Sequence, residues 1–500
     1  MISCLHHLIF DAAIKWPKRI AMIEPGRENI TYGQLNEKVN LLSHQILKIG
    51  LRKGERVGIL SRNSIASVAV YFAISRAGGV VVPLNYTLDP LDILERTRDC
   101  AISAIYVGKG LELKARKVID KTRSTRFVIE EIKEEKGLGA KKFPIVLEND
   151  LASIVYTSGT TRRPLGVMLS HKNLISNTKS IVEYMNLKAK DRICCVLPFY
   201  YIYGLSLLLS HFLVGGAVII DNRFMYPEAV LDAIDEYKAT GFAGVSSHYA
   251  ILLYKSNFAK RALRSLKYFM QAGDSMPQNI TLKLITIFPN KKLYVMYGQT
   301  EASPRLTFLN PDLVKTKPNS IGRAIPGVRV KLINEKGKSC RAYEEGEITA
   351  RGDNIMLEYW NNHRETKKVL KDGWLYTGDI AYKDKDGDLF IVGRKKNLMK
   401  IGGHRINPLE IERLIMEHGS VMEAAVVSVK DPLLGEKTRL FASSMPGKKI
   451  DKEDIMKFCK RRLPSYKVPR EVVIVDSLPK NSLGKIDREA LAAGYKEGAG

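Results

Sequence analysis

The sequence predicts an α/β fold: a large N-terminal domain of parallel-rich sheets covered by helices, followed by a small α+β C-terminal domain. Three observations predict it. Short apolar runs alternate with helical segments along most of the chain, and from about Trp374 the chain changes to turn-rich, β-rich segments. In addition, 500 residues exceed what one hydrophobic core usually fills, so at least two domains are expected.

The alternation begins in the first hundred residues. RVGIL (56–60) and VVVPL (80–84) are apolar runs of strand length, and AISAIYVG (101–108) is another. ASVAVYFAISRAGG (66–79) is long enough for a helix and ends at glycine. Strands that alternate with helices predict a parallel sheet with helices on its faces. ASIVY (152–156) is one more strand of this kind.

The charged segment 130–142 has two glycines and no apolar period, which indicates a linker or surface loop. Strand and helix then alternate again through GAVIID, EAVLDAIDEY, GFAGV, LKYFMQAG and KKLYVMYG. Ligands of open α/β sheets bind where loops leave the carboxyl ends of strands. The loops that contain SSHY (246–249), QAGDS (271–275) and YGQTE (297–301) are therefore natural site candidates.

The last hundred residues suit a small α+β domain. They are expected to contain an amphipathic helix (408–417), a strand (424–429), a basic helix (452–462) and a strand (471–475).

Composition sets limits on partners and compartment. The 79 basic and 53 acidic side chains give a formal charge of +26, which favours anionic ligands or partners, or else only solvates the surface. The six cysteines form no C-x-x-C pair, as expected in a reducing compartment. The most apolar stretch (203–220) contains His211 and a Gly-Gly break, so a buried helix and strand fit better than a membrane span. With no signal pattern at the N-terminus, a cytoplasmic protein is expected.

The loop YTSGTTRRPLGV (156–167) directly follows the predicted strand 152–156. It lacks the G-x-x-x-x-G-K-[ST] pattern of the common nucleotide loop. Its hydroxyls and backbone N–H groups could still face phosphate oxygens, although a surface turn is an alternative for the loop taken alone.

Six further motifs follow in order: LPFYYIYGL (197–205), MYGQTE (296–301), SIGRAIPGV (320–328), WLYTGD (374–379), LFIVGRKKNLMKIGGHRINPLEIE (389–412) and LPKNSLGKIDR (478–488). Together with the loop, they resemble the adenylate-forming acyl-CoA synthetase, or AMP-binding, superfamily. The resemblance runs from about Phe10 to Leu491, nearly the whole chain.

The resemblance implies that ATP activates a carboxylic acid to an acyl-adenylate, which a thiol then attacks. Charge accumulates on the phosphates during adenylation, so the site needs donors, a cation and a positioned acid. Thr300 is expected near the α-phosphate, and Glu301 would hold Mg²⁺, which prefers oxygen ligands. Asp379 would accept bonds from the two ribose hydroxyls and Arg394 would help to hold the ribose, while Lys485 would bridge acid and nucleotide.

The remaining nucleotide contacts come from three loops, with Tyr297 expected against adenine. They are Thr157, Ser158, Gly159, Thr160, Thr161, Gly273, Asp274, Tyr297, Gly298 and Gln299. Taken singly, Asp379 could cap a turn and Glu301 could be a solvated acid; the ordered set of motifs favours the functional interpretation.

For the second half-reaction, the resemblance implies that a mobile C-terminal domain swings to exchange catalytic faces. The hinge would lie at Lys395–Lys396, with Lys396 as the single choice, so the domains are 1–394 and 395–500. Lys400, Gly402 and Gly403 would line the path of the thiol, because glycine lets a pantetheine arm pass close to the backbone.

The acid is expected to be fatty or aryl. The stretch FYYIYG has no carboxylate that could pair an amino group, and an unpaired ammonium would be costly there. The residues that we expect to line the acyl pocket, called the acyl-pocket residues below, are Tyr201, Tyr203, Gly204, His248, Tyr249, Ala272 and Met296.

Two departures from the family pattern stand out. The phosphate loop of the family usually has the pattern TSGTTGxPKGV. In this chain Arg162 replaces the middle glycine and Leu165 replaces the lysine. Arg162 does not enter a left-handed conformation cheaply, and one cation is missing unless Arg162 or Arg163 replaces it. Tyr201 stands where histidine is frequent, either as an aromatic gate or as a plain core residue.

The leading interpretation is an acid–thiol ligase that uses ATP, Mg²⁺ and CoA. One alternative loads the phosphopantetheine of an acidic acyl carrier protein, and another is a degenerate paralogue with weakened adenylation. A nucleic-acid-binding protein is disfavoured, because no helix-turn-helix pattern, zinc spacing or RNP-like strand is present.

Overall fold

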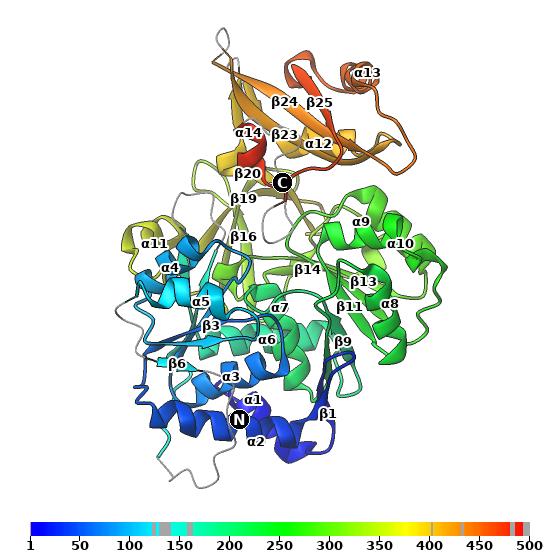
Figure 1. Cartoon of the computed structure of the whole chain (residues 1–500). Helices are drawn as coiled ribbons and strands as arrows, with labels where there is room; N and C mark the ends of the chain where they lie inside the picture. Colours follow the sequence, from blue (N-terminus) through cyan, green and yellow to red (C-terminus); the bar gives the residue numbers. More distant parts are fainter. Residues whose placement is uncertain are drawn as a thin grey trace.

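The computed structural model describes residues 2–122, 127–129, 142–157, 164–401, 404–431, 435–480 and 486–493. Figure 1 shows a large body that contains two helix-covered sheets, with a third, smaller sheet and the C-terminal part above it. The predicted α/β class with a large N-terminal and a small C-terminal part is confirmed.

The first sheet of the body has six strands in the order β6-β5-β3-β4-β7-β8. All neighbours are parallel except β7 and β8. The strands expected at 56–60, 80–84, 101–108 and 152–156 are all present. The bounds are β3 Arg56–Leu60, β4 Val80–Leu84, β5 Ala104–Val107, β6 Phe127–Ile129, β7 Leu151–Tyr156 and β8 Gly166–Ser170. The helices of this region are α2 Tyr32–Lys48, α3 Ile65–Arg76, α4 Pro90–Asp99 and α5 Glu112–Ile119.

Helix α3 illustrates how local sequence sets these elements. The Ser64 hydroxyl accepts a 3.0 Å bond from the Ser67 amide, and the Ser67 hydroxyl lies 3.0 Å from the Ser64 amide, so the first turn is capped from both sides. Gly78, with φ of +77°, turns the chain after the helix toward β4. The helix is buried on almost every face, which explains its continuous apolar sequence.

The second sheet has nine strands in the order β15-β14-β13-β12-β11-β9-β10-β1-β2. From β1 to β13 its neighbours are parallel, and antiparallel strands close both edges. The bounds are β1 Ile20–Ile23, β2 Asn29–Thr31, β9 Arg192–Cys195, β10 Ala217–Ile220, β11 Gly241–Gly244, β12 Tyr268–Gln271, β13 Lys292–Tyr297, β14 Thr307–Leu309 and β15 Arg323–Ala324.

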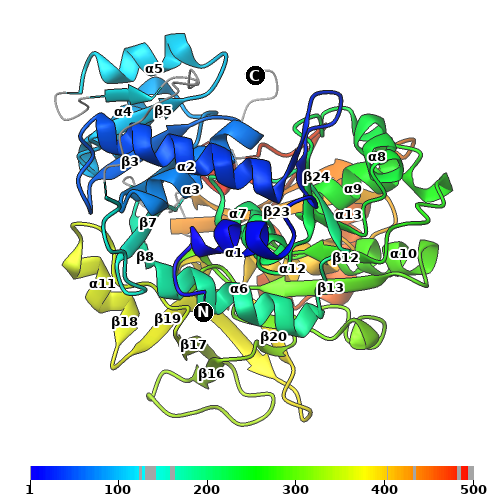
Figure 2. The ribbon, with the colours of Figure 1, turned by 90° about the horizontal axis from the view of Figure 1, so that it is seen from below.

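Helices α1 His7–Lys15, α6 His171–Met185 and α7 Ile202–Leu213 pack together in the body. In Figure 2, α1 lies near the centre of the lower face, with α2 and α3 on one side and α6 on the other. The stretch 203–220 forms α7 and then β10, both buried, as the sequence predicts. The other helices of this sheet are α8 Pro227–Glu236, α9 Ser246–Lys255 and α10 Gln278–Ile287, with 3-10 turns η1 Phe258–Lys260, η2 Thr300–Ala302 and η3 Pro311–Leu313.

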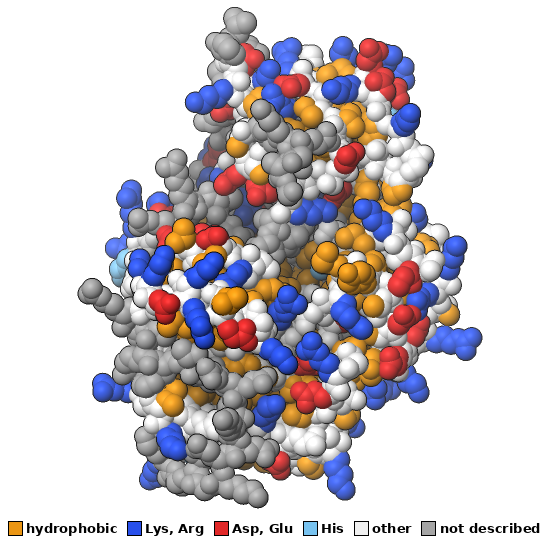
Figure 3. Space-filling model, in the orientation of Figure 1, with side chains coloured by type: hydrophobic (Ala, Val, Ile, Leu, Met, Phe, Trp, Pro, Cys, Tyr) orange, Lys and Arg blue, Asp and Glu red, His pale blue; other side chains and the backbone are white. Residues whose placement is uncertain are grey.

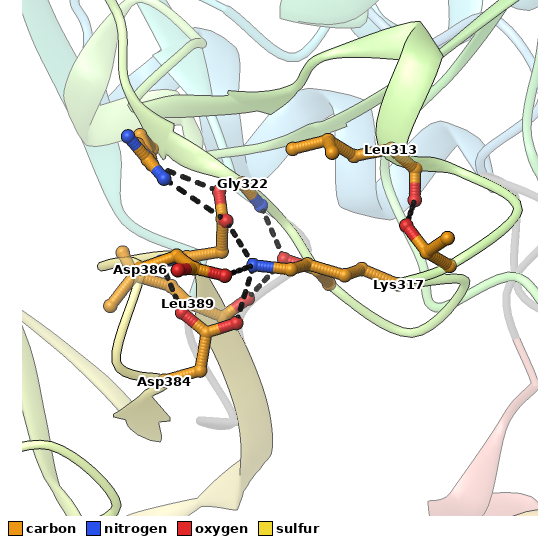
Figure 4. A network of polar contacts seen from close by, with 10 residues as sticks. Leu313, Lys317, Gly322, Asp384, Asp386 and Leu389 are labelled. Carbon is orange, nitrogen blue, oxygen red and sulfur yellow. Dashed lines mark hydrogen bonds and ion pairs between the residues drawn. The ribbon is translucent and has the colours of Figure 1, made fainter.

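A smaller, five-stranded sheet follows. Its strands are β16 Val328–Ile333, β17 Gly346–Gly352, β18 Leu370–Lys371, β19 Trp374–Lys383 and β20 Leu389–Arg394, and α11 His363–Val369 precedes β18. At the turn between β19 and β20, Lys317 Nζ lies 2.6–2.7 Å from carboxylate oxygens of Asp384, Asp386 and Asp388 (Figure 4). Arg323 Nε also contacts Asp388 at 3.1 Å. These contacts fix the β19–β20 hairpin against the body.

The C-terminal part has its own core and a three-stranded sheet. Arg488 makes two contacts with Glu412, of 2.5 and 2.8 Å, which join the last described helix to α12. The predicted helices at 408–417 and 452–462 and the strands at 424–429 and 471–475 are present. The bounds are η4 Lys395–Asn397, β21 Met399–Ile401, β22 His404–Ile406, α12 Pro408–Ile415, β23 Val421–Asp431, β24 Gly435–Ser444, α13 Lys452–Arg462, η5 Ser465–Lys467, β25 Glu471–Val475 and α14 Arg488–Ala492.

The surface charge, the cysteines and the helix lengths can be compared with what the composition led us to expect. Lys and Arg side chains are spread over the whole face drawn in Figure 3 and are interspersed with acidic ones, rather than gathered in one patch. All six cysteines are buried free thiols. None of the helices in the described part of the chain is long and apolar enough to cross a membrane.

Candidate active site

Three candidate segments lie side by side because their strands are neighbours. β11, β12 and β13 are parallel, with Gly244 opposite Gln271 and Gln271 opposite Val295. The segments that follow these strands therefore leave the sheet at the same edge, as expected for a ligand site of an open α/β sheet. SSHY, predicted as a loop, instead forms the first turn of α9, because the helix begins directly after β11 and Val245. In Figure 3, hydrophobic side chains gather in a hollow below the C-terminal part on this side of the molecule.

Asp379, Tyr297 and Arg394 meet in one cluster. The Tyr297 hydroxyl donates to Asp379 Oδ2 at 2.7 Å, and Arg394 Nε donates to Asp379 Oδ1 at 2.8 Å. Asp379 is in register with Arg394 across β19 and β20, so the strand pairing itself places the two side chains together. The Asp379 side chain is 7% exposed whereas that of Arg394 is 44% exposed. The cluster is a buried carboxylate with one solvent-facing cation.

The pKa shifts of this cluster follow from burial and charge. Burial, reinforced by the Asp379 carboxylate, raises the pKa of Tyr297, so the phenol remains a hydrogen-bond donor. The same carboxylate raises the pKa of Arg394, against the effect of burial. Each Asp379 oxygen thus already accepts one bond, and a carboxylate oxygen has room for a second donor.

Glu301 is held by a residue that the sequence analysis missed. The Tyr359 hydroxyl donates to Glu301 Oε1 at 2.7 Å, and the backbone amide of Met356 donates to the Glu301 carbonyl at 2.9 Å. Burial and the Glu301 charge raise the pKa of Tyr359, which keeps it a donor. Among the described residues, no donor binds the second carboxylate oxygen of Glu301. Glu301 as a whole is half-buried, and an open carboxylate oxygen on it fits a hard cation such as Mg²⁺.

The loop around Glu301 is tightly folded. Thr300 and Glu301 lie in the 3-10 turn η2, and Gln299 precedes it with extended backbone. A Cβ on Gly298 would collide with the carbonyl of Pro304, so the chain returns close to this position only because it is glycine.

The acyl-pocket residues divide into two groups. Tyr201 and His248 are half-buried, and the Tyr201 hydroxyl lies 2.9 Å from where a Cβ of Gly273 would be. Gly273 has φ of +97°, a backbone conformation that favours glycine. A side chain at this position would also collide with the Tyr201 hydroxyl. His248 packs at 4.2 Å against the Phe224 ring, and its pKa is lowered to about 4 by burial and by Lys480.

The second group, which contains the remaining acyl-pocket residues, is buried, and hydrogen bonds hold three of its side chains in place. The hydroxyls of Tyr203 and Tyr249 donate to the same carbonyl, that of Met270, at 2.9 and 2.7 Å. Met296 Sδ accepts a 3.1 Å contact from the Tyr184 hydroxyl. Ala272 and Gly204 are buried beside them, and a Cβ on Gly204 would collide with the Pro198 carbonyl. This group is therefore packed inside the body, behind the half-buried Tyr201 and His248.

A small cavity of about 30 Å³ adjoins the same motif on its other side. Phe199, Tyr200 and Leu205 line it, together with Tyr71, whose buried hydroxyl meets no partner among the described residues. The space suffices for one or two water molecules and no more.

Only part of the phosphate loop falls within the described residues. The Thr157 amide donates to the Leu165 carbonyl at 3.0 Å, and the Leu165 side chain packs against the main core. Ser158, Gly159, Thr160, Thr161, Arg162 and Arg163 lie outside the described residues. Their predicted roles stay predictions.

The C-terminal part approaches the three candidate segments. The charge of Lys480 acts on His248, and that of Asp274 acts on Arg488. Burial and the charge of Arg394 lower the pKa of Lys396, while Asp379, Glu301 and Glu489 oppose that shift. Lys400 lies in β21, with Gly402, Gly403 and Lys485 outside the described residues.

The family model "AMP-binding enzyme" matches residues 9–360, and "AMP-binding enzyme C-terminal domain" matches residues 410–485. The chain belongs to the AMP-binding enzyme family. This membership confirms the resemblance seen in the motifs.

Relatives within the AMP-binding family match this chain over nearly its full length. The chain is 30% identical to the long-chain-fatty-acid–CoA ligase of Bacillus subtilis (strain 168), over 97% of this chain and 94% of that protein. It is 29% identical to the indoleacetate–CoA ligase of Aromatoleum aromaticum (strain DSM 19018 / LMG 30748 / EbN1), over 95% and 96%. Among solved structures, o-succinylbenzoate CoA synthetase of Bacillus subtilis bound to its acyl-adenylate matches with a TM-score of 0.87 at 27% identity, covering 98% of each chain.

The same synthetase bound to ATP and magnesium matches with a TM-score of 0.86 at 26% identity, over 97% of this chain and 98% of that chain. The chain is therefore an AMP-forming acid–thiol ligase that uses ATP, Mg²⁺ and CoA. It activates a carboxylic acid to an acyl-adenylate and transfers the acyl group to CoA. Loading of a carrier protein, the alternative, is not favoured by these relatives.

Proposed function

We propose that the acid is fatty or aryl and that the Asp379 cluster is the ribose subsite. The observation that carries the proposal is the pair of bonds from Tyr297 and Arg394 to a carboxylate that is nearly buried. A carboxylate fixed from two sides is oriented in advance for two adjacent hydroxyls, which lowers the entropy cost of binding. Arg394, at the exposed side of the pair, is available to the same ribose.

Magnesium, when bound, neutralises charge that develops on the phosphates. We assign it to Glu301, whose position the Tyr359 bond fixes. Thr300, the adjacent residue in η2, would lie near the α-phosphate. The hydroxyls of the loop 157–161 would line the remaining phosphates.

The proposal that the acid has an apolar skeleton next to its reacting carboxylate rests on the residues around Tyr201. His248 is neutral at pH 7 because its pKa is lowered to about 4, so it supplies no cation there. Tyr201 and Gly273 form a narrow contact, consistent with an aromatic gate beside the acid. The free buried thiols agree with a cytoplasmic enzyme.

We further propose that 395–500 swings about Lys396 between two catalytic faces. Support comes from the described residues on either side of 481–485: Lys480 is close to His248, and Arg488 is close to Asp274. In this arrangement Lys485 would serve adenylation. Lys400, Gly402 and Gly403 would serve thiol attack after the swing.

A pyrophosphate-release screen tests the proposal. Purified protein with ATP and Mg²⁺ is given fatty and aryl acids in turn, with amino acids as the contrasting class. Release with fatty or aryl acids and none with amino acids is expected. Release only with amino acids would refute the assignment of the acid. A second screen compares CoA with a phosphopantetheinylated carrier protein as the acceptor, with CoA expected to be faster.

A further inference from the structure

Arg305 is a buried guanidinium that the adenylation scheme does not use. It is 2% exposed, and its Nε and Nη2 meet no acceptor among the residues that the structure describes. Arginine is almost never fully buried without a partner, because unpaired donors lose their hydration and gain nothing in return. A ligand that supplies acceptors at this point is the simplest physical reason for such an arrangement.

Arg305 lies among residues that are predicted to line the acyl pocket. The guanidinium carbon lies 4.3 Å from the centre of the Tyr203 ring. Burial raises the pKa of Tyr184 to about 12, and the charge of Arg305 together with a side-chain hydrogen bond from it opposes that rise, so Tyr184 is a partner of the guanidinium while Nε and Nη2 stay without an acceptor among the described residues. The Tyr184 hydroxyl in turn contacts Met296 at 3.1 Å. Arg305 therefore touches, directly or through one residue, two of the acyl-pocket residues.

The backbone of Arg305 is rigidly held. The side-chain amides of Asn177 and Asn354 donate to its carbonyl at 2.9 and 3.0 Å, and each also reaches the carbonyl of Ala302. Ala302 directly follows Glu301 in the 3-10 turn η2. The backbone from which the Arg305 side chain extends is thus fixed relative to the proposed magnesium and phosphate site.

The two unpartnered donors have a definite geometry. Nε–H and Nη2–H lie along one edge of the planar guanidinium and point the same way, which matches the two oxygens of a carboxylate. We propose that Arg305 binds a second carboxylate, at the far end of the acid that is activated. The acid is then a dicarboxylic acid with a fatty or aryl skeleton. This inference rests on the proposed function, because it assumes that the acid enters between the three candidate segments.

The test compares matched acids that differ only in the far carboxylate. Octanoate is paired with suberate, hexanoate with adipate and phenylpropionate with its para-carboxy derivative, in a pyrophosphate-release assay with saturating ATP. The wild-type protein is expected to prefer the diacid in at least one pair by about tenfold to a hundredfold in kcat/KM. If every pair favours the monoacid, or shows no preference, the inference is overturned while the ligase assignment stands. If no acid of either kind releases pyrophosphate, the proposed function itself fails.

Two variants locate the preference. In Arg305→Met the apolar chain keeps its length, so diacid activity is expected to fall by about tenfold to a hundredfold while monoacid activity is kept or rises. Arg305→Lys keeps the charge without the two-pronged edge and is expected to fall in between. Arg329→Met, an exposed arginine near Trp374, is the matched control and should change nothing. Equal loss for both acids of a pair would show a purely structural arginine solvated by buried water, and would overturn the inference.

Folding is checked independently by the thermal unfolding midpoint and by ATP binding of each variant. If Arg305→Met does not fold, the wild-type comparison of matched acids and the Arg305→Lys variant still decide the question.

Discussion

Tyr297 and Asp379 lie 82 positions apart in the chain, and yet the tyrosine hydroxyl donates a 2.7 Å bond to the carboxylate. The bond joins the end of β13, in the nine-stranded sheet, to β19 of the five-stranded sheet. Nucleotide recognition is therefore proposed at a junction between two sheets, and its geometry depends on how these sheets pack.

Asp379→Ala is expected to weaken ATP binding strongly without unfolding the protein. Two bonds from ribose hydroxyls to a charged acceptor, together with the loss of orientation of Arg394, amount to about 3 kcal/mol. Isothermal titration with ATP measures the change, and the thermal midpoint controls for folding. Unchanged affinity would remove Asp379 from the proposed ribose subsite.

Tyr359→Phe removes only the hydroxyl that binds Glu301. A hydrogen bond to a charged group is worth about 1.5–3 kcal/mol, so the concentration of Mg²⁺ that gives half-maximal pyrophosphate release should rise about tenfold or more. Tyr382→Phe, on an aromatic stack with Phe390 away from this cluster, is the control. A Mg²⁺ dependence equal to that of the wild type would contradict a role for the Tyr359–Glu301 pair in holding the cation.

Lys485→Ala should abolish acyl-adenylate formation, whereas thioester formation from supplied acyl-adenylate should survive. The expectation follows from the place of this lysine in the last motif and from the two-face scheme. Each half-reaction is measured separately, by pyrophosphate release and by thioester yield. Parallel loss of both would speak against domain alternation.

The altered phosphate loop leads to a prediction about its arginine. If Arg162 supplies the cation that Leu165 does not, Arg162→Ala should slow adenylation by about two to three powers of ten, and Leu165→Lys in that background should restore part of it. Because Leu165 packs partly against the core, the lysine has a stability cost, and unfolding must be measured alongside the rate.

The double change Arg162→Gly with Leu165→Lys rebuilds the usual loop and should match or exceed the wild-type rate at saturating ATP. A fast Arg162→Ala would transfer the role to Arg163. Absence of pyrophosphate release from every form, with any acid, would instead favour a degenerate paralogue.

Lys317→Met tests the carboxylate network of Figure 4 through the pH dependence of stability. Burial alone would raise the pKa of Asp384, but the bond from Lys317 lowers it below its ordinary value. Such a group stabilises the fold above its unfolded pKa of about 3.9, and this stabilisation is lost as pH falls through the lower folded pKa. The wild type should therefore lose stability steeply below about pH 4.

In Lys317→Met three carboxylates face one another without the ammonium, so stability should already be lower at pH 7 and should improve on mild acidification as one carboxylate protonates. Urea unfolding at a series of pH values measures this. Lys331→Met, a lysine of the same five-stranded sheet close to Trp374, is the control. If the free energy of unfolding depends on pH in the same way in the wild type and in Lys317→Met, the network does not contribute electrostatically to stability.

The sequence predicted the elements well where periodicity was strong. Strands such as 56–60 and 80–84 match because continuous apolar runs bounded by turns have few alternative structures. The helix predicted at 66–79 is shorter, since the reciprocal Ser64–Ser67 cap starts it at Ile65 and Gly78 turns the chain after it. The ordered motifs gave the family, which the full-length matches confirm.

What the sequence could not predict are contacts between distant segments. Tyr359 lies in no motif, and only the return of the chain after β17 brings it to Glu301. Arg305 has an ordinary hydrophilic identity, and only burial reveals it as unusual. Neither periodicity nor local propensity shows that Tyr359 reaches Glu301 or that Arg305 is buried. The position of Arg305, four residues after Glu301, was the one signal in the sequence that could have drawn attention to it.

Arg394 contacts Asp379 and is the residue directly before the turn Lys395–Asn397, where the chain leaves the five-stranded sheet. In the proposed ribose subsite, a bound ribose and the exit path of the chain would thus share one guanidinium. By linkage, any preference of the nucleotide for one orientation of the C-terminal part must be matched by an equal preference of that orientation for the nucleotide. Departure of AMP would then remove the preference of the C-terminal part for that orientation.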